Sequence, residues 1–140
     1  MTIEESQQEI IDEFTFLADW MDKYEMIIQM GKELPMIEEQ YKKPENLIKG
    51  CQSQVWLHAE NKDNLLYFTA DSDALITKGL VALVVKVLSG HSAKEIIESN
   101  LHFVDDIGLK SHLSPTRSNG LLSMLKQIKN YAIAFHSLEK

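Results

Sequence analysis

The stretch from Ala74 to Leu88 restricts the possible fold more than any other part of this sequence. It reads ALITKGLVALVVKVL, and its only charges are those of Lys78 and Lys86. This composition predicts a helix that is apolar on most of its sides, and such a helix is usually buried at the centre of a domain. We therefore expect the rest of the chain to be wrapped around it.

Amphipathic helices are predicted before this central one. From Ile10 to Ile28 the apolar residues recur every three or four positions, which is the period of a helix with one buried face. Asp19, with Asp22 three positions later, indicates that this stretch divides into two helices. Gly31 and Pro35 are expected to end it.

Three helices are also predicted after the central one. Ser92 and Glu95 have the spacing of a capping box, so a short helix should begin there. A further helical turn is expected from Phe103 to Ile107. Ser114 followed by Pro115 predicts the start of a long last helix, because proline fits the first helical position.

Between these helical regions the hydrophobic period changes to two. Residues 54–60 alternate between apolar and polar, which predicts a strand with one buried face. NKDN at 61–64 is typical of a turn, and LLYFTA at 65–70 is expected to return as the second strand of a hairpin. Asp71 or Ser72 is then expected to cap the central helix.

A third, shorter strand is predicted at Leu47 and Ile48, which are apolar and precede the hairpin. The fold class is therefore α+β, with a small antiparallel sheet of about three strands packed against helices from both chain ends. At 140 residues, the whole chain from 1 to 140 is expected to form a single domain.

Composition narrows the classes of partner. The formal net charge is −7, whereas nucleic acids and anionic membranes attract clusters of Lys and Arg. The longest apolar run, at 80–85, is far shorter than the roughly 20 residues of a membrane span, and the acidic N-terminus does not resemble a signal peptide. We expect a cytoplasmic monomer with a protein or small-molecule partner.

The single cysteine, Cys51, lies in an unusual setting. Its neighbours in KGCQSQVW, residues 49–56, are a lysine, a glycine and small polar residues rather than the apolar residues of a core. A reactive thiol needs access and nearby positive charge, and Lys49 with Gly50 offers both. A lone cysteine is also often a small buried hydrophobe, so the sequence leaves both interpretations open.

Other kinds of thiol or metal site fit the sequence poorly. A papain-like hydrolase would pair Cys51 with His112 and Asn119, but no cysteine-protease signature surrounds the cysteine. With one thiol, a zinc or iron–sulfur site built within this chain is not expected. Neither HxxxH nor HExxH spacing occurs among the five histidines, which are His58, His91, His102, His112 and His136.

Two charged residues near predicted helix starts have both a structural and a functional interpretation. Asp73 suits the first turn of a helix, where a carboxylate is favoured by the helix dipole. Arg117 opposes the dipole of the last helix, and a residue placed against a local rule is sometimes held there by function. A plain surface arginine is the alternative.

Three segments together resemble the motifs of the SufE family of sulfur acceptors. They occur in the same order and with similar spacing, and the resemblance extends over nearly the whole chain. It implies a SufE/IscU-like fold. The segments are IKGCQSQVW (48–56), DSDALITKGL (71–80) and LSPTRSNGL (113–121).

The resemblance implies a sulfur-transfer accessory protein rather than an enzyme. In that family, one cysteine takes sulfur from the persulfide of a pyridoxal-phosphate-dependent cysteine desulfurase of the SufS type, and the desulfurase is stimulated. Sulfur then passes to a SufBCD-like scaffold for iron–sulfur cluster assembly, and no cofactor is bound by the acceptor itself. Cys51 matches the acceptor cysteine. A CsdA-type desulfurase is the alternative partner.

Supporting roles follow from the same motifs. Arg117 is expected to pair with the persulfide or with a partner carboxylate, and Asp73 to order the loop or meet a partner base. Gly50 would let the cysteine swing between a sheltered and an extended position. The residues expected to contact the transferred sulfur or to shape the turn are Gln52, Ser53 and Gln54.

Two other functions are alternatives to that of a sulfur carrier. The protein is alternatively a non-covalent activator of a desulfurase with an incidental cysteine, or a stand-alone thiol enzyme. A cluster scaffold of the IscU type shares the general shape, but it needs several cysteines to hold iron, and this chain has one.

Overall fold

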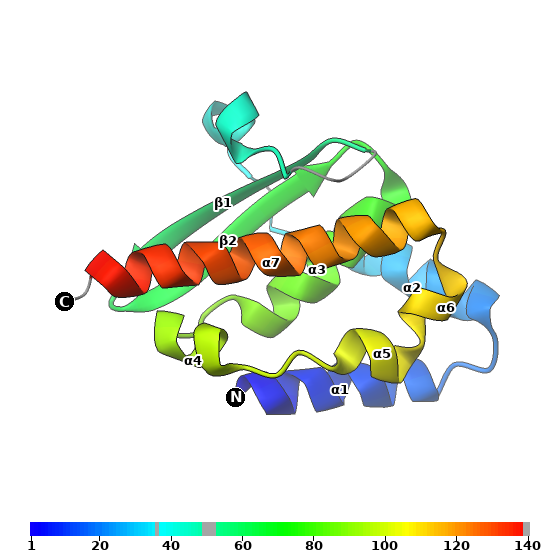
Figure 1. The fold of residues 1–140 in the computed structure, drawn as a ribbon. Helices are drawn as coiled ribbons and strands as arrows, with labels where there is room; N and C mark the ends of the chain where they lie inside the picture. Colours follow the sequence, from blue (N-terminus) through cyan, green and yellow to red (C-terminus); the bar gives the residue numbers. More distant parts are fainter. Residues whose placement is uncertain (36, 49–52, 139–140) are drawn as a thin grey trace.

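The fold, taken from a computed structural model, is α+β, as predicted (Figure 1). The structure describes residues 1–35, 37–48 and 53–138. Among these residues, none of the helices has both the length and the apolar character needed to cross a membrane. In chain order the elements are α1 (Ile3–Thr15), α2 (Trp20–Lys32), the 3-10 turns η1 (Glu39–Tyr41) and η2 (Pro44–Asn46), β1 (Val55–Lys62), β2 (Leu65–Ser72), α3 (Leu75–Leu88), α4 (Ala93–Glu98), α5 (Phe103–Ile107), α6 (Leu109–His112) and α7 (Pro115–Leu138).

Helix α3 is the centre of the hydrophobic core, as its composition predicts. It contacts α2, the strand β2, α7 and α1. Figure 1 shows the hairpin on one side of α3 and α1 on the other, with α7 crossing between them in front. Nearly every side chain from Leu80 to Leu88 is buried, and Lys86 is the exception.

Helix α2 ends at Lys32, between Gly31 and Pro35, as predicted, and Gly31 lies in its last turn. The helix packs against α3 at Gly79. A Cβ atom built on Gly79 would lie 2.1 Å from the backbone oxygen of Ile27, and one on Gly31 would lie 2.9 Å from the Gly79 nitrogen. The glycines therefore allow the two backbones to approach closely.

The hairpin forms with a tighter turn than predicted. Strands β1 and β2 pair in antiparallel register from Val55 opposite Ser72 to Lys62 opposite Leu65. Only Asp63 and Asn64 connect them, with φ angles of 54° and 66°. Positive φ at both central residues is the requirement of a type I′ turn, whose twist matches that of paired strands.

The predicted third strand is reduced to a single bridge. Leu47 pairs with Trp56, and the Ile48 N–H donates to the Val55 oxygen at 2.9 Å. Because η2 ends at Asn46, few residues before position 49 are free to extend along β1. Within the described residues the sheet therefore has two strands.

Two of the predicted helix starts are formed by side-chain caps. The Asp19 carboxylate accepts from the Asp22 N–H at the start of α2. Ser92 and Glu95 form the complete capping box of α4. The predicted starts were correct here because the signals are local in sequence.

The predicted cap of α3 was wrong. Asp71 and Ser72 end the strand β2, and the helix begins at Leu75 after Ala74, which makes no side-chain capping bond. The Ser72 hydroxyl accepts from the Ala74 N–H at 3.3 Å. Asp71 is used elsewhere, in the ion pairs described below.

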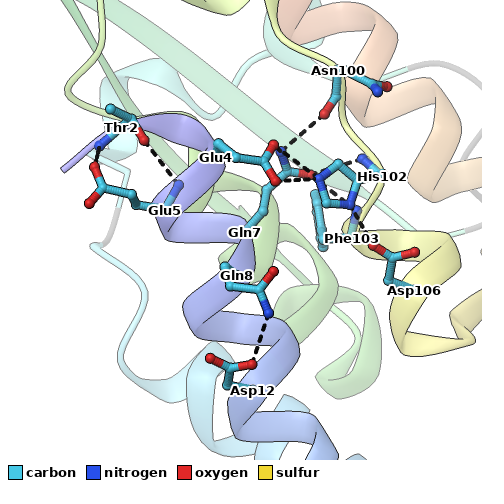
Figure 2. Close-up of polar contacts among 10 residues, drawn as sticks. All are labelled: Thr2, Glu4, Glu5, Gln7, Gln8, Asp12, Asn100, His102, Phe103 and Asp106. Atoms are coloured by element: carbon cyan, nitrogen blue, oxygen red, sulfur yellow. Dashed lines mark hydrogen bonds and ion pairs between the residues drawn. The ribbon is translucent and has the colours of Figure 1, made fainter.

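The first helix is tied to α5 by a buried amide (Figure 2). Gln7 is fully buried, and its side-chain oxygen accepts from the N–H groups of His102 and Phe103 at 2.9 and 3.1 Å. Its amide nitrogen donates to the Asn100 oxygen at 3.0 Å. A buried amide is stable only when its polar atoms are paired, and here both ends are.

The His102 ring adds a charged link at the same junction. One ring nitrogen faces Asp106, and the other lies 2.8 Å from the Glu4 carboxylate (Figure 2). Hydrogen bonds to Asp106 and then to Glu4 raise the pKa of His102 above its ordinary value. Protonation of this ring therefore strengthens the α1–α5 contact.

We expect the contribution of His102 to folding stability to be lost as the pH rises. The pKa is raised in the folded state, so the contribution is complete below the unfolded value of about 6.5 and disappears as the pH passes the folded pKa. His102→Gln removes the titrating group. The difference in urea-unfolding free energy between the native chain and this variant should shrink between about pH 6 and about pH 9. An equal difference at both pH values would contradict this role.

Candidate functional site

The structure describes part of the predicted site. Ser53, Gln54, Asp73 and Arg117 lie within the described residues. Cys51, with Gly50 and Gln52, lies outside them, so the predicted position of the thiol at a strand-to-strand tip and its swing about Gly50 stay predictions. The geometry of the site is therefore built from the residues on either side of positions 49–52.

These two sides are joined to each other. The Ile48–Val55 hydrogen bond of 2.9 Å and the Leu47–Trp56 bridge hold the chain before the cysteine against the chain after it. We call these four residues the stem. The described chain on either side of positions 49–52 therefore meets at the stem.

Asp73 fixes the end of this connection to the start of α3. The Gln54 N–H donates to the Asp73 carboxylate at 3.1 Å, and the Asp73 N–H donates to the Gln54 oxygen at 3.3 Å. The carboxylate therefore acts on the backbone of the cysteine-bearing motif, although Asp73 belongs to the second motif. This contact supports the prediction that Asp73 orders the loop.

A small cavity brings the three sequence motifs together. Its volume is about 80 Å³, and it lies between the end of the cysteine segment, the first turns of α3 and the start of α7. Metabolite pockets usually measure about 300–1,000 Å³, so this cavity has room for a small group only. The lining residues are Ser53, Thr77, Leu80, Thr116, Arg117, Gly120 and Met124.

The cavity is electropositive on its α7 side. Helix α7 starts at Pro115 as predicted, with the Ser114 hydroxyl accepting from the Arg117 N–H at 3.2 Å. A helix N-terminus carries a partial positive charge, and the Arg117 guanidinium adds a full one. This arrangement favours an anionic group, such as a thiolate, over a neutral one.

A second charged cluster lies beside the stem, and the sequence did not reveal it. The Asp71 carboxylate lies 2.8 Å from the Lys42 nitrogen and 3.3 Å from the Lys78 nitrogen. Burial alone would raise the pKa of Asp71, but hydrogen bonds from Lys42, from the Ser72 N–H and from Lys78 outweigh it and lower that pKa. The bond to Asp71, and then that to Glu39, raises the pKa of Lys42.

The alternative sites considered from the sequence gain no support. In the described part of the chain, no three His, Cys, Asp or Glu residues are grouped to hold a metal ion. His112, the candidate base of a papain-like site, stacks on Trp20 with ring centres 3.8 Å apart, and its Nδ1 lies 3.1 Å from the Gly108 oxygen. The ring is therefore used in packing α6 against α2.

Comparison with known proteins decides the family. A family model described as an Fe-S metabolism associated domain, SufE, matches residues 8–132. The chain belongs to the SufE family. Membership associates it with iron–sulfur metabolism and confirms the resemblance found in the three motifs.

Three relatives named SufE-like match this chain along most of its length. An uncharacterised SufE-like protein of Rhizobium meliloti (strain 1021) is 46% identical over 132 residues, covering 91% of this chain and 94% of the relative. An uncharacterised SufE-like protein of Rhizobium etli is 44% identical over 132 residues, covering 91% and 89%. SufE-like protein 1, chloroplastic/mitochondrial, of Arabidopsis thaliana is 43% identical over 128 residues, which are 90% of this chain but 34% of that longer protein.

A solved structure shares the fold. The solution structure of a hypothetical protein from Thermus thermophilus matches this SufE-family chain with a TM-score of 0.77. The match covers 92% of this chain and 94% of the other at 17% sequence identity. At that identity the likeness supports the fold alone.

We expect Asp73→Ala to loosen the end of the cysteine segment. The variant removes the acceptor of the Gln54 N–H, and a hydrogen bond of this kind contributes about 1 kcal/mol, equivalent to roughly fivefold in an exchange rate. Amide hydrogen exchange at Gln54, followed by NMR, should accelerate by about this factor. Asp73→Asn keeps a side-chain oxygen and should restore most of the protection, whereas unchanged exchange in the alanine variant would reject the contact.

Proposed function

We propose that this SufE-family protein accepts sulfur on Cys51 from the persulfide of a cysteine desulfurase of the SufS type. It stimulates the desulfurase by clearing its thiol and delivers the sulfur for iron–sulfur cluster assembly. The observation that carries the proposal is the convergence of all three motifs on one electropositive cavity beside the cysteine segment. Membership of the family supports it.

The proposed reaction is an exchange at sulfur. The Cys51 thiolate attacks the outer sulfur of the desulfurase persulfide, so a new S–S bond forms at Cys51 as the S–S bond on the desulfurase breaks. The electron pair of the broken bond leaves with the desulfurase cysteine as its thiolate. Atoms and charge balance without an external oxidant or reductant, and Cys51 carries the persulfide away.

The described residues suit this chemistry. Arg117 and the start of α7 supply positive charge where a thiolate or persulfide anion would lie. Ser53 and Thr77 offer hydroxyl groups at the same cavity. Its small volume suits a sulfur-bearing side chain and would shelter it from oxidation between transfers.

The remaining parts of the proposal concern partners and setting. The protein needs no cofactor of its own, because the desulfurase supplies the pyridoxal phosphate. We propose a SufBCD-like scaffold as the sulfur recipient, with the protein acting as a cytoplasmic monomer. Gly50 and Gln52 would shape the movement and contacts of Cys51 during transfer.

Intact mass is the direct test of the carrier function. The protein is incubated with a SufS-type desulfurase and free cysteine, and its intact mass is measured by mass spectrometry without reductant. The Cys51→Ser variant is treated in the same way. We expect the native chain alone to gain whole sulfur atoms. Equal stimulation of the desulfurase by both proteins, with no sulfur gained, would favour the non-covalent activator instead. If the native chain gains no sulfur and the desulfurase is not stimulated, the proposal is rejected.

Arg117→Ala is expected to slow sulfur uptake about tenfold while leaving the fold intact, because a hydrogen bond involving a charged group contributes about 1.5 kcal/mol or more. Desulfurase stimulation at equal protein concentration is the measurement. Lys126→Ala removes another exposed basic side chain of α7 and should change little. Native stimulation by the Arg117 variant would exclude a role for this charge.

A further inference from the structure

The Asp71 cluster, formed by Asp71, Lys42 and Lys78, has no assigned role in the sulfur chemistry proposed above, yet it lies beside the stem. The Asp71 side chain is only 12% exposed and makes ion pairs with both lysines, at 2.8 Å to Lys42 and 3.3 Å to Lys78. A buried carboxylate is costly unless it is paired in this way. We therefore ask what the largely buried Asp71 carboxylate does at this position.

Asp71 connects three parts of the fold. It belongs to β2 and lies opposite Trp56 of the stem in the strand register. Lys42 comes from the segment between η1 and η2 that leads to the cysteine, and its nitrogen also lies 5.7 Å from the centre of the Trp56 ring. Lys78 comes from α3. The cluster thus joins the chain before the cysteine, the strand after it and the central helix.

The segment before the cysteine is held at its ends by apolar burial and between them by polar and ring contacts. Ile37 before η1 and Ile48 after η2 are buried, whereas neither η1 nor η2 contains a buried residue. Between these two anchors the segment contacts the sheet through the pair between Lys42 and Asp71 and through the stacking of Tyr41 on His58, whose ring centres lie 3.6 Å apart. Of these two contacts, only the ion pair reaches the strand residue opposite the stem.

We propose that Asp71, acting through Lys42, is a positioning residue for sulfur transfer: it holds the incoming segment so that the stem presents Cys51 in one productive arrangement. The inference rests on the proposed function, because the transfer step is its readout. In this proposal Asp71 acts through Lys42 and not by contact with the transferred sulfur. Small displacements of a reacting group are costly in rate, so loss of the ion pair should lower the rate within the complex rather than the affinity of the complex.

Lys42 is the residue to change, because removing Asp71 would also break the ion pair of Lys78 and would leave Lys42 paired only with Glu39, 3.3 Å away. Lys42→Met keeps the length and apolar stem of the side chain but removes its charge. Lys42→Arg restores the charge and can still reach the carboxylate. Lys43→Met is the matched control, because Lys43 is the next residue, is exposed and pairs only weakly with Glu45, at 3.9 Å.

Two measurements separate positioning from general stability. The first is amide hydrogen exchange at Ile48, whose N–H closes the stem, with Leu83 in the middle of the buried helix α3 as the reference for global unfolding. The second is sulfur transfer from a SufS-type desulfurase over a range of acceptor concentrations, which separates kcat from the half-saturating concentration. Ile96→Val is the stability control: it removes a buried methyl group from α4 and lowers global stability without changing the stem.

We expect Lys42→Met to accelerate exchange at Ile48 about tenfold relative to Leu83 and to lower kcat by a similar factor, with the half-saturating concentration within about twofold of native. Lys42→Arg should restore both, and Lys43→Met and Ile96→Val should leave both near native. Faster exchange at Ile48 with a native kcat would overturn the inference, as would equal effects of Lys42→Met and Ile96→Val. If the native chain itself accepts no sulfur, the proposed function fails, and the positioning role fails with it.

Discussion

A helix without a polar face has to be covered on every side, and this requirement organises the molecule. Helix α3 satisfies it by contacting α2, β2, α7 and α1. On the α2 side the cover is unusually close, because Gly31 and Gly79 let the two backbones meet without intervening side chains. The shorter helices α4, α5 and α6 pack against the helices that cover α3. Helix α5, for example, is tied to α1 through the hydrogen bonds of Gln7.

The candidate site follows from the way α3 is covered. Strand β2 runs almost directly into α3, so the end of the hairpin and the first turn of the helix occupy one place. Helix α7 packs on α3 from the other end of the chain, which brings its first turn to the same cavity. Residues far apart in sequence, such as Ser53 and Arg117, thus meet beside the cysteine segment without a dedicated binding cleft.

Local signals in the sequence were sufficient for most of the fold. The caps at Asp19 and Ser92 and the alternation in β1 depend on neighbours a few residues away, and the structure confirms them. Predictions failed where a distant partner decided the outcome. Asp71 is a residue type that often caps helices, but two lysines from other segments form ion pairs with its carboxylate.

The same distinction applies to the site. The position of Arg117 at a helix start, against the helix dipole, indicated a candidate site residue, and Arg117 lines the same cavity as Ser53. The motifs indicated that Asp73 orders the loop, but they did not indicate that its partner is the Gln54 backbone, and they gave no signal of the ion pair between Lys42 and Asp71.

The hydrogen bond between Ile48 and Val55 also limits how far Cys51 can move from the fold in the proposed sulfur transfer. An extended chain advances at most about 3.6 Å per residue, so position 51 stays within roughly 11 Å of Ile48. Carriers with long flexible linkers can serve two active sites while remaining attached to one assembly. A tether as short as this one cannot span two sites, so the proposed sulfur transfer would require the whole domain to leave its donor and diffuse to its recipient. The flux through such a carrier rises with its concentration and with the rates of two successive protein encounters.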